Sequence, residues 1–495
     1  MLRSFLMAVA AGLFACDEVT AAPAAAPNFI VIFTDNQGWQ DLGVYGSTDL
    51  ATPNIDQLAA EGMRFTDFYA ELSCGPARAA LMTGSYPPRL SLAFDHVPEA
   101  KTGIHPAEIT LAELLRAKGY ATMLVGKWHL GDHPQFLPLR HGFDAFYGIP
   151  YSNDMWPFHP LTHPTYPLDS EPPRLQAARR RAELTGFSGQ QAGQFFAAGK
   201  DFPDLPLYQN DEIIEFNPEP DTLTTRFTQE AIEFIREHRD KPFFLYLAHA
   251  MPHTPLGASD RFRGKSSRGL YGDVIAEIDW SVGEIVTTLR ELEIDSNTLI
   301  VYTSDNGPWV HYGIDSGTSW PFRGGAGTIL EGGSRVPAIA RWPGHIPPGK
   351  VTGEPVGLID IYPTFARLAG APLPKGRVID GKDISALLLG EPGASSPHEA
   401  RYYFLPAPPG EVTLGAVRAG RWKLHLRQQP TPRVLRPWLE VRLNAYRLYD
   451  LETDPTEVND LLDAHPQMAR QLSAMATRFR RDLQKSIRPL GKVDE

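Results

Sequence analysis

Four short apolar segments, each followed at once by polar residues, limit what this chain can fold into. They lie at 28–34, 120–125, 242–248 and 298–303. Runs that are apolar at nearly every position are typical of parallel strands covered by helices on both faces. Helices are predicted between and around them, at 52–62, 109–118, 222–238 and 271–292, with Asn54 as a helix cap. The alternation predicts an α/β fold: a large, mostly parallel mixed sheet flanked by helices, with its site at the carboxyl edge.

The chain of 495 residues is longer than one ordinary domain. We expect a catalytic domain at 27–392 and, after a Gly-, Pro- and Ser-rich linker, a smaller C-terminal α+β domain at 398–495. Antiparallel strands and a final helix are predicted in that second domain, at 401–426, 446–449 and 466–483. The Pro-rich stretch at 155–221 lacks clear periodicity and predicts an insertion over the site.

The N-terminal segment at 1–26 is predicted to be an export signal and tether. It combines one basic residue with an apolar run too short to span a bilayer, followed by Ala and Pro. We therefore expect a periplasmic or secreted protein, with lipid attachment at Cys16 as an alternative to simple secretion. In either case Cys74 has no partner for an internal disulfide. The net charge of −11 argues against a general nucleic-acid binder.

Two Asp-Asn pairs follow predicted strands. Asp35-Asn36 comes after the first apolar segment, and Asp305-Asn306 after the fourth. Each pair alone is equally compatible with ordinary turn chemistry. Two carboxylates and two amide oxygens together form a ligand set suited to a hard divalent cation, Ca²⁺ or Mg²⁺.

Cys74 lies in the sequence Cys74-Gly75-Pro76-Ala77-Arg78, which has the C-x-P-x-R pattern that a formylglycine-generating enzyme modifies. A lone cysteine is more often a small buried apolar residue. The composition gives each cysteine at most roughly a 1% chance of carrying both flanking residues. Lys127, His129 and His253 follow predicted strands, where they can converge with Arg78 on one site.

Together these motifs resemble the formylglycine-dependent sulfatases of the alkaline phosphatase superfamily, from about Pro27 to Leu462. The segment 148–154, Gly-Ile-Pro-Tyr-Ser-Asn-Asp, is similar to the arylsulfatase A branch in particular. Further matching segments are Asp41-Leu42-Gly43, Thr83-Gly84, Gly126 to Gly131, Pro252 to Pro255, Arg323-Gly324-Gly325, Glu331 to Pro337, and Leu448 to Glu457.

The resemblance implies a mechanism and a set of site residues. Cys74 becomes formylglycine, whose hydrate attacks sulfur with help from the metal and Arg78. His129 then takes a proton from the second hydroxyl, so that sulfate is expelled. Lys127 neutralises sulfate oxygens, His253 assists the leaving oxygen and Ser152 contributes a polar contact to the substrate. The implied metal ligands are Asp35, Asn36, Cys74, Asp305 and Asn306, with Ca²⁺ expected and Mg²⁺ as the alternative.

Two positions depart from the family pattern. Asn36 stands where the family usually has Asp, and Ala326 where it usually has a lysine that contacts sulfate and the leaving group. Either Arg323 replaces that lysine, or its charge is simply lost, which we favour. The expected substrate is a small-molecule or carbohydrate sulfate ester. Two alternatives are a phosphodiester or phosphonate monoester hydrolase of the same superfamily, and a catalytically impaired protein that binds sulfated ligands.

Overall fold

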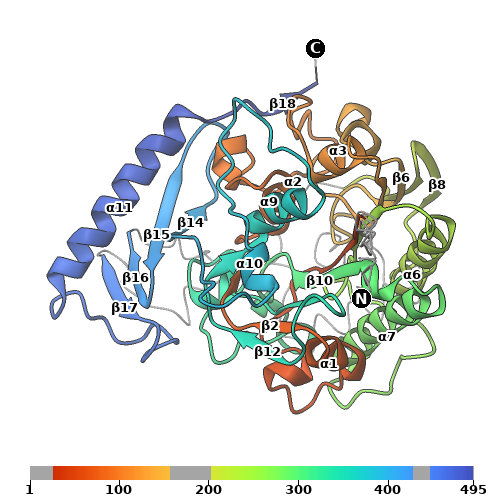
Figure 1. Ribbon diagram of the computed structural model, residues 1–495, viewed down its shortest axis with the longest axis horizontal. Coiled ribbons are helices and arrows are strands. Elements are labelled where there is room, and N and C mark those ends of the chain that lie inside the picture. Colours follow the sequence, from red (N-terminus) through yellow and green to blue (C-terminus); the bar gives the residue numbers. More distant parts are fainter. Residues whose placement is uncertain (1–25, 157–201, 427–445, 494–495) are drawn as a thin grey trace, which may run out of the picture.

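A ten-stranded mixed sheet forms the centre of the larger part of the protein (Figure 1). The computed structural model describes residues 26–156, 202–426 and 446–493. Cys16, nearly all of the predicted export signal and most of the predicted insertion lie outside these residues. The strands, in their order across the sheet, are β12 (Lys350–Thr352), β2 (Met63–Phe65), β11 (Ala338–Arg341), β10 (Thr298–Ser304), β1 (Asn28–Thr34), β9 (Phe243–Ala248), β5 (Ala121–Lys127), β6 (Ala145–Ile149), β7 (Pro206–Gln209) and β8 (Glu212–Phe216).

The five central strands, β10, β1, β9, β5 and β6, run parallel, and antiparallel pairings extend the sheet on both sides. Their carboxyl ends therefore lie along one edge. All seven residues of β1 are buried, as expected for a strand covered on both faces.

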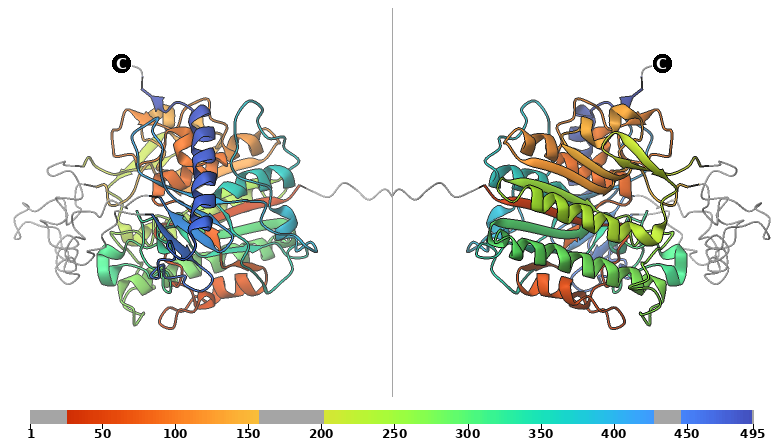
Figure 2. Two further views of the ribbon diagram at one scale, coloured as in Figure 1. Left: turned by 90° about the vertical axis from the view of Figure 1, so that its left-hand side faces the viewer. Right: turned by 90° about the vertical axis from the view of Figure 1, so that its right-hand side faces the viewer.

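Helices cover both faces of this sheet. The side chains of β1 alternate between the two faces and show which helices cover each one. Phe29, Val31 and Phe33 belong to one core, with residues of α2, α3 and α9, while Ile30 and Ile32 belong to a second core, with residues of α1, α6 and α7. Figure 2 (right) shows α6 and α7 along one face. The helix bounds are α1 (Pro53–Ala60), α2 (Cys74–Thr83), α3 (Leu111–Arg116), α6 (Pro220–Glu237), α7 (Leu270–Glu291), α8 (Glu331–Ser334), α9 (Leu358–Leu368), α10 (Ser385–Leu388) and α11 (Pro466–Lys485).

A separate four-stranded antiparallel sheet forms the C-terminal part, and α11 packs against it (Figure 1). Its strands are β14 (Arg401–Leu405), β15 (Thr413–Ala419), β16 (Trp422–His425) and β17 (Arg447–Asp450). The chain then returns to the larger part, where β18 (Gly491–Lys492) pairs with β4 (Thr102–Gly103). A further short pair joins β13 (Val356–Gly357) to β3 (Phe68–Tyr69). No helix among the described residues is long and apolar enough to cross a membrane.

The predicted α/β class, with a large mixed sheet and a smaller C-terminal sheet, is confirmed, and three details are corrected. Thr52, not Asn54, is at the N-cap position of α1, although its side chain makes no capping hydrogen bond; Asn54 lies in the first turn and its side chain donates to Asp279. The strand predicted at 120–125 continues to Lys127. Residues 206–216, placed in the insertion, form the β7–β8 hairpin, whose exposed residues do not alternate cleanly.

Candidate active site

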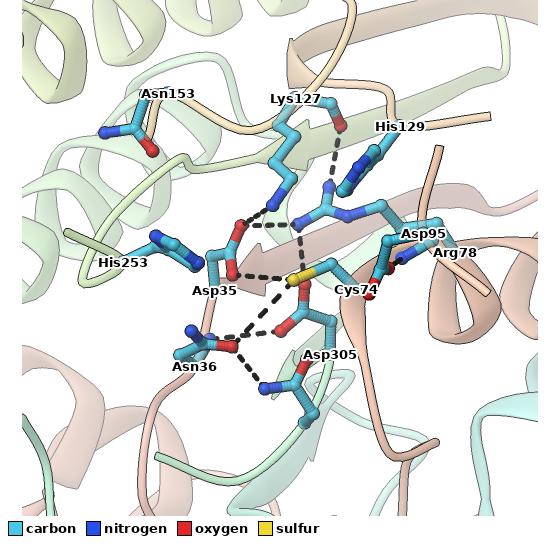
Figure 3. Close-up of polar contacts among 12 residues, drawn as sticks. Asp35, Asn36, Cys74, Arg78, Asp95, Lys127, His129, Asn153, His253 and Asp305 are labelled. Carbon is cyan, nitrogen blue, oxygen red and sulfur yellow. Dashed lines mark hydrogen bonds and ion pairs between the residues drawn. The ribbon is translucent and has the colours of Figure 1, made fainter. Parts of the chain in front are cut away.

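Most of the predicted site residues converge at the carboxyl edge of the central strands: Asp35, Asn36, Cys74, Arg78, Lys127, His129, His253, Asp305 and Asn306 (Figure 3). Asp35 follows β1, Lys127 ends β5 and Asp305 follows β10. Each of these three side chains is completely buried. The order of the strands thus brings Asp35 and Asp305, 270 positions apart in the chain, into one site.

Cys74 is the first residue of α2 and points into this group. Its Sγ atom lies 3.3 Å from Asp35 Oδ1 and 3.9 Å from Asn36 Oδ1. Burial, together with Asp305 and Asp35, raises the pKa of the thiol well above its usual value, so the sulfur keeps its proton and donates a hydrogen bond to Asp35 Oδ1. The Cys74 sulfur stands where the oxygens of a hydrated formylglycine would be.

The two Asp-Asn pairs form one cluster of oxygen atoms. Asp305 Oδ1 accepts the backbone N–H of Asn36 at 3.0 Å, and the Asn306 amide donates to Asn36 Oδ1. Asn36 has a left-handed backbone with a φ of 62°, and its Oδ1 faces the Cys74 sulfur.

This cluster fits a divalent cation. Among the described residues, the buried Asn306 Oδ1 has no hydrogen-bond partner. Burial and the charge of Asp35 raise the pKa of Asp305 to about 6, so this pair of carboxylates would gain from an added positive charge. The donor set of carboxylate and amide oxygens is that of a hard cation.

Two buried cations face the carboxylates. Arg78 donates to Asp305 Oδ2 at 2.8 Å, to Asp35 Oδ2 at 3.3 Å and to the Lys127 carbonyl at 2.7 Å. Lys127 Nζ lies 2.5 Å from Asp35 Oδ2. Burial opposes the charge of Asp35, yet Lys127, His253 and Arg78 outweigh it and lower its pKa. Both cations therefore stay charged at a buried position where an anion would bind.

The two histidines lie on different sides of the sulfur. A His253 nitrogen groups with Asp35 and Cys74, and a His129 nitrogen with Cys74 and Asp95; within each group the atoms lie no more than 4.8 Å apart. His129 Nε2 lies 3.1 Å from the His96 carbonyl oxygen, which can only accept, so Nε2 carries the proton. Burial, Lys127 and Arg78 hold the pKa of His129 well below its usual value. His129 Nδ1 is thus a buried proton acceptor, with no partner among the described residues.

His253 has the opposite tautomer. Its Nδ1 donates to the Thr254 carbonyl at 2.6 Å, which leaves Nε2 for the substrate. The ring also makes an edge contact with Trp309, with 5.4 Å between centroids, so its orientation is fixed from two sides.

Two further side chains in the site were missed by sequence reasoning. Asp95 accepts the backbone N–H of Gly75 at 2.7 Å, and burial raises its pKa. No strand end or motif marks this residue. Asn153 lies within the arylsulfatase-like segment 148–154 but is not among the predicted site residues, and it is buried beside Ser152. Ser152 Oγ is buried and has no partner in the described part of the chain.

The segment that carries Ala326 is bonded both to loops beside the site and to Glu457 in the C-terminal part. Ala326 donates its backbone N–H to the Pro308 carbonyl at 2.9 Å. The Arg323 side chain donates to the Glu457 carbonyl, and Glu457 Oε2 accepts the backbone N–H of Glu331 at 2.7 Å. Arg323 is therefore engaged away from the position of the missing lysine.

Comparison with known proteins shows that the chain is similar to sulfatases. The family model for sulfatases matches residues 27–371, and that for the C-terminal region of N-sulphoglucosamine sulphohydrolase matches residues 327–485. Human arylsulfatase A is 39% identical over 477 residues, covering 93% of this chain and 86% of the relative. N-acetylgalactosamine-6-sulfatase of Sus scrofa is 39% identical, covering 85% and 74%.

Solved structures with a similar fold also match most of the chain. The PsFucS1 sulfatase from Pseudoalteromonas sp. is similar with a TM-score of 0.78 and 30% identity, covering 94% of this chain and 92% of that one. Ps i-CgsB in complex with k-i-k-neocarrahexaose has a TM-score of 0.72 and 29% identity, with 94% of both chains covered.

Fold, site and comparisons together define a sulfuric ester hydrolase with an alkaline-phosphatase-like fold. More particularly, the chain belongs to the sulfatase family, and its resemblance to arylsulfatase A is confirmed over most of its length.

Proposed function

We propose that this protein hydrolyses an organic sulfate ester to an alcohol and inorganic sulfate, with formylglycine at position 74 and a bound Ca²⁺ or Mg²⁺ ion. The observation that carries the proposal is the convergence on the Cys74 sulfur of an oxygen cluster and two histidines with fixed, opposite tautomers. We further propose that the chain is exported and that a formylglycine-generating enzyme modifies it.

Formylglycine and a cation would each supply one part of the chemistry. Hydrated formylglycine at position 74 would supply two hydroxyl groups, one as the nucleophile toward sulfur and one whose proton has to be removed before sulfate can leave. A divalent cation held by Asp35, Asn36, Asp305 and Asn306 would polarise the attacking hydroxyl and neutralise a sulfate oxygen.

The described side chains supply the remaining steps. Lys127 and Arg78 are buried and charged, so they can neutralise the sulfate without reorganising. His129 Nδ1 has the free lone pair needed to remove the proton of the second hydroxyl. When its ring carries a second proton, His253 can donate from Nε2 to the leaving oxygen while Nδ1–H stays on the Thr254 carbonyl. Ser152 Oγ offers a weaker polar contact to the substrate.

The test is to produce the protein together with a formylglycine-generating enzyme. We expect the tryptic peptide containing Cys74 to carry formylglycine by mass spectrometry, and the protein to hydrolyse aryl sulfates in preference to matched aryl phosphates. Cys74→Ser should be almost inactive or stop as a sulfated enzyme, because a serine ester has no neighbouring hydroxyl to expel sulfate. A fully active protein that retains an unmodified thiol would disprove the mechanism.

A further inference from the structure

Asn153 has an amide whose orientation is fixed. It is 2% exposed, and its Nδ2 atom donates to the Pro255 carbonyl at 3.3 Å. Because a carbonyl oxygen only accepts hydrogen bonds, the other end of the amide must be the oxygen. Figure 3 shows this oxygen on the side toward Lys127 and His253, with the nitrogen turned outward.

The Asn153 oxygen lacks a partner within the described ranges of the chain. A buried amide oxygen that is left unpaired costs roughly 1–3 kcal/mol, so such atoms are nearly always satisfied in a folded protein. The neighbouring Ser152 Oγ and Asp154 Oδ1 are likewise buried without a partner in this part of the structure. Three consecutive residues thus have unpaired polar atoms, and the Asn153 oxygen, which faces Lys127 and His253, is positioned to bind a polar ligand.

The chemistry of an acceptor restricts what that ligand is. A sulfate group carries only acceptor oxygens, and the bridging oxygen of the ester has no hydrogen either. Asn153 Oδ1 therefore cannot bind the group that Lys127 and His253 serve. It can bind a hydroxyl or N–H group on the alcohol part of the substrate, close to the ester.

We infer that Asn153 accepts a hydrogen bond from a hydroxyl group adjacent to the sulfate ester, and that the substrate is accordingly a sugar sulfate rather than a simple aryl or steryl sulfate. This inference rests on the proposed sulfatase function and adds a specificity-determining residue to it. The side chain lies next to the segment that holds His253, since Pro255, its hydrogen-bond partner, is two residues further along the chain. Binding of the neighbouring hydroxyl would thus orient the leaving oxygen toward His253.

The experiment compares wild type, Asn153→Ala and Asn459→Ala, a control that removes an exposed amide from the C-terminal part. Mass spectrometry first establishes formylglycine in all three. The probes are methyl galactosides sulfated at O3, O4 or O6, deoxy analogues of the one hydrolysed best, and 4-nitrophenyl sulfate. Values of kcat and KM are measured for each.

We expect Asn153→Ala to lower kcat/KM on the sugar sulfate by roughly 10- to 100-fold, the effect of leaving one hydrogen-bonding group unpaired, and far less on 4-nitrophenyl sulfate. Retained aryl sulfate activity also shows that the variant is folded. One deoxy analogue should lose the same factor with wild type and show no further loss with Asn153→Ala. An equal fall on both substrates, or no fall on the sugar sulfate, would overturn the inference. If wild type carries formylglycine yet cleaves no sulfate ester, the proposed function itself fails.

Discussion

Glu457 provides the sharpest test of how the C-terminal sheet supports the site. The side chain is completely buried, and its Oε1 atom lies 2.9 Å from Lys423 Nζ and 2.8 Å from His425 Nε2. Its other oxygen accepts the Glu331 backbone N–H, at the end of the segment that carries Ala326. Glu457→Gln keeps the shape of the side chain but removes its charge.

The loss of folding stability expected for Glu457→Gln follows from the pKa of Glu457. Burial opposes ionisation of Glu457, but Lys423 and His425 outweigh it and lower the pKa from 4.5 to about 2. At about 1.4 kcal/mol for each pH unit, the ionised carboxylate contributes roughly 3 kcal/mol to folding. Breaking a buried ion pair typically costs about 3–5 kcal/mol, which agrees with the value obtained from the pKa. Because the pKa is lowered in the folded state, this stability is fully present above pH 4.5 and is lost as the pH falls toward 2.

Urea unfolding at a fixed concentration of divalent cation measures the free energy of unfolding of wild type and of Glu457→Gln. Glu452→Gln is the matched control. Glu452 pairs with Arg421 at the surface, where its side chain is 67% exposed, so its loss should cost less than about 1 kcal/mol. We expect Glu457→Gln to lose roughly 3 kcal/mol at pH 7, and the gap to wild type to shrink below pH 4.5. Equal small losses in both variants, or a gap that does not change between pH 7 and pH 3, would refute the reasoning.

Two further predictions concern the metal and the missing lysine. Chelation should abolish sulfatase activity and Ca²⁺ or Mg²⁺ should restore it; Asp305→Ala should weaken Ca²⁺ binding, measured by calorimetry, more than Asn36→Ala, because only Asp305 carries a charge. Full activity in protein shown to be metal-free would exclude the cation site. Ala326→Lys should raise kcat/KM for sulfates with poor leaving groups by about 10-fold, since Arg323 is bound to Glu457 and does not replace the lost charge. A flat dependence of the wild-type rate on leaving-group acidity would contradict this.

The sequence was sufficient to predict residues whose position depends on a strand end. Asp35, Lys127 and Asp305 were predicted at the carboxyl edge because parallel strands bring such residues together whatever loops join them. The four main strands and the helices between them were recovered for the same reason, since burial on both faces leaves a continuous apolar run. The Cys74 motif could be identified from the sequence because all its residues lie within five consecutive positions.

Residues placed by loops and by tertiary contacts could not be predicted. Asp95 reaches Cys74 from a loop that has neither strand nor helix, so no periodicity marks it. The β7–β8 hairpin was missed because Ile213, Ile214 and Phe216 are exposed, which removes the alternation of a half-buried strand. The orientation of Arg323 depends on Glu457, which is 134 positions away, and this contact favours simple loss of the lysine charge at Ala326.

Ala326 and Asn153 both affect the departure of the leaving oxygen, by different means. The Ala326 segment bonds to Pro308, whose neighbour Trp309 contacts His253, and Asn153 bonds to Pro255, two residues after His253. A lysine at 326 would stabilise charge on the leaving oxygen, which develops only in the transition state, so its absence should lower kcat. A hydrogen bond from Asn153 to a neighbouring hydroxyl is made in the ground state as well, so it should act on KM and on alignment. This chain would therefore compensate for a lost cation by holding a sugar hydroxyl, and its preference among sulfate esters would depend on the group beside the ester as well as on leaving-group acidity.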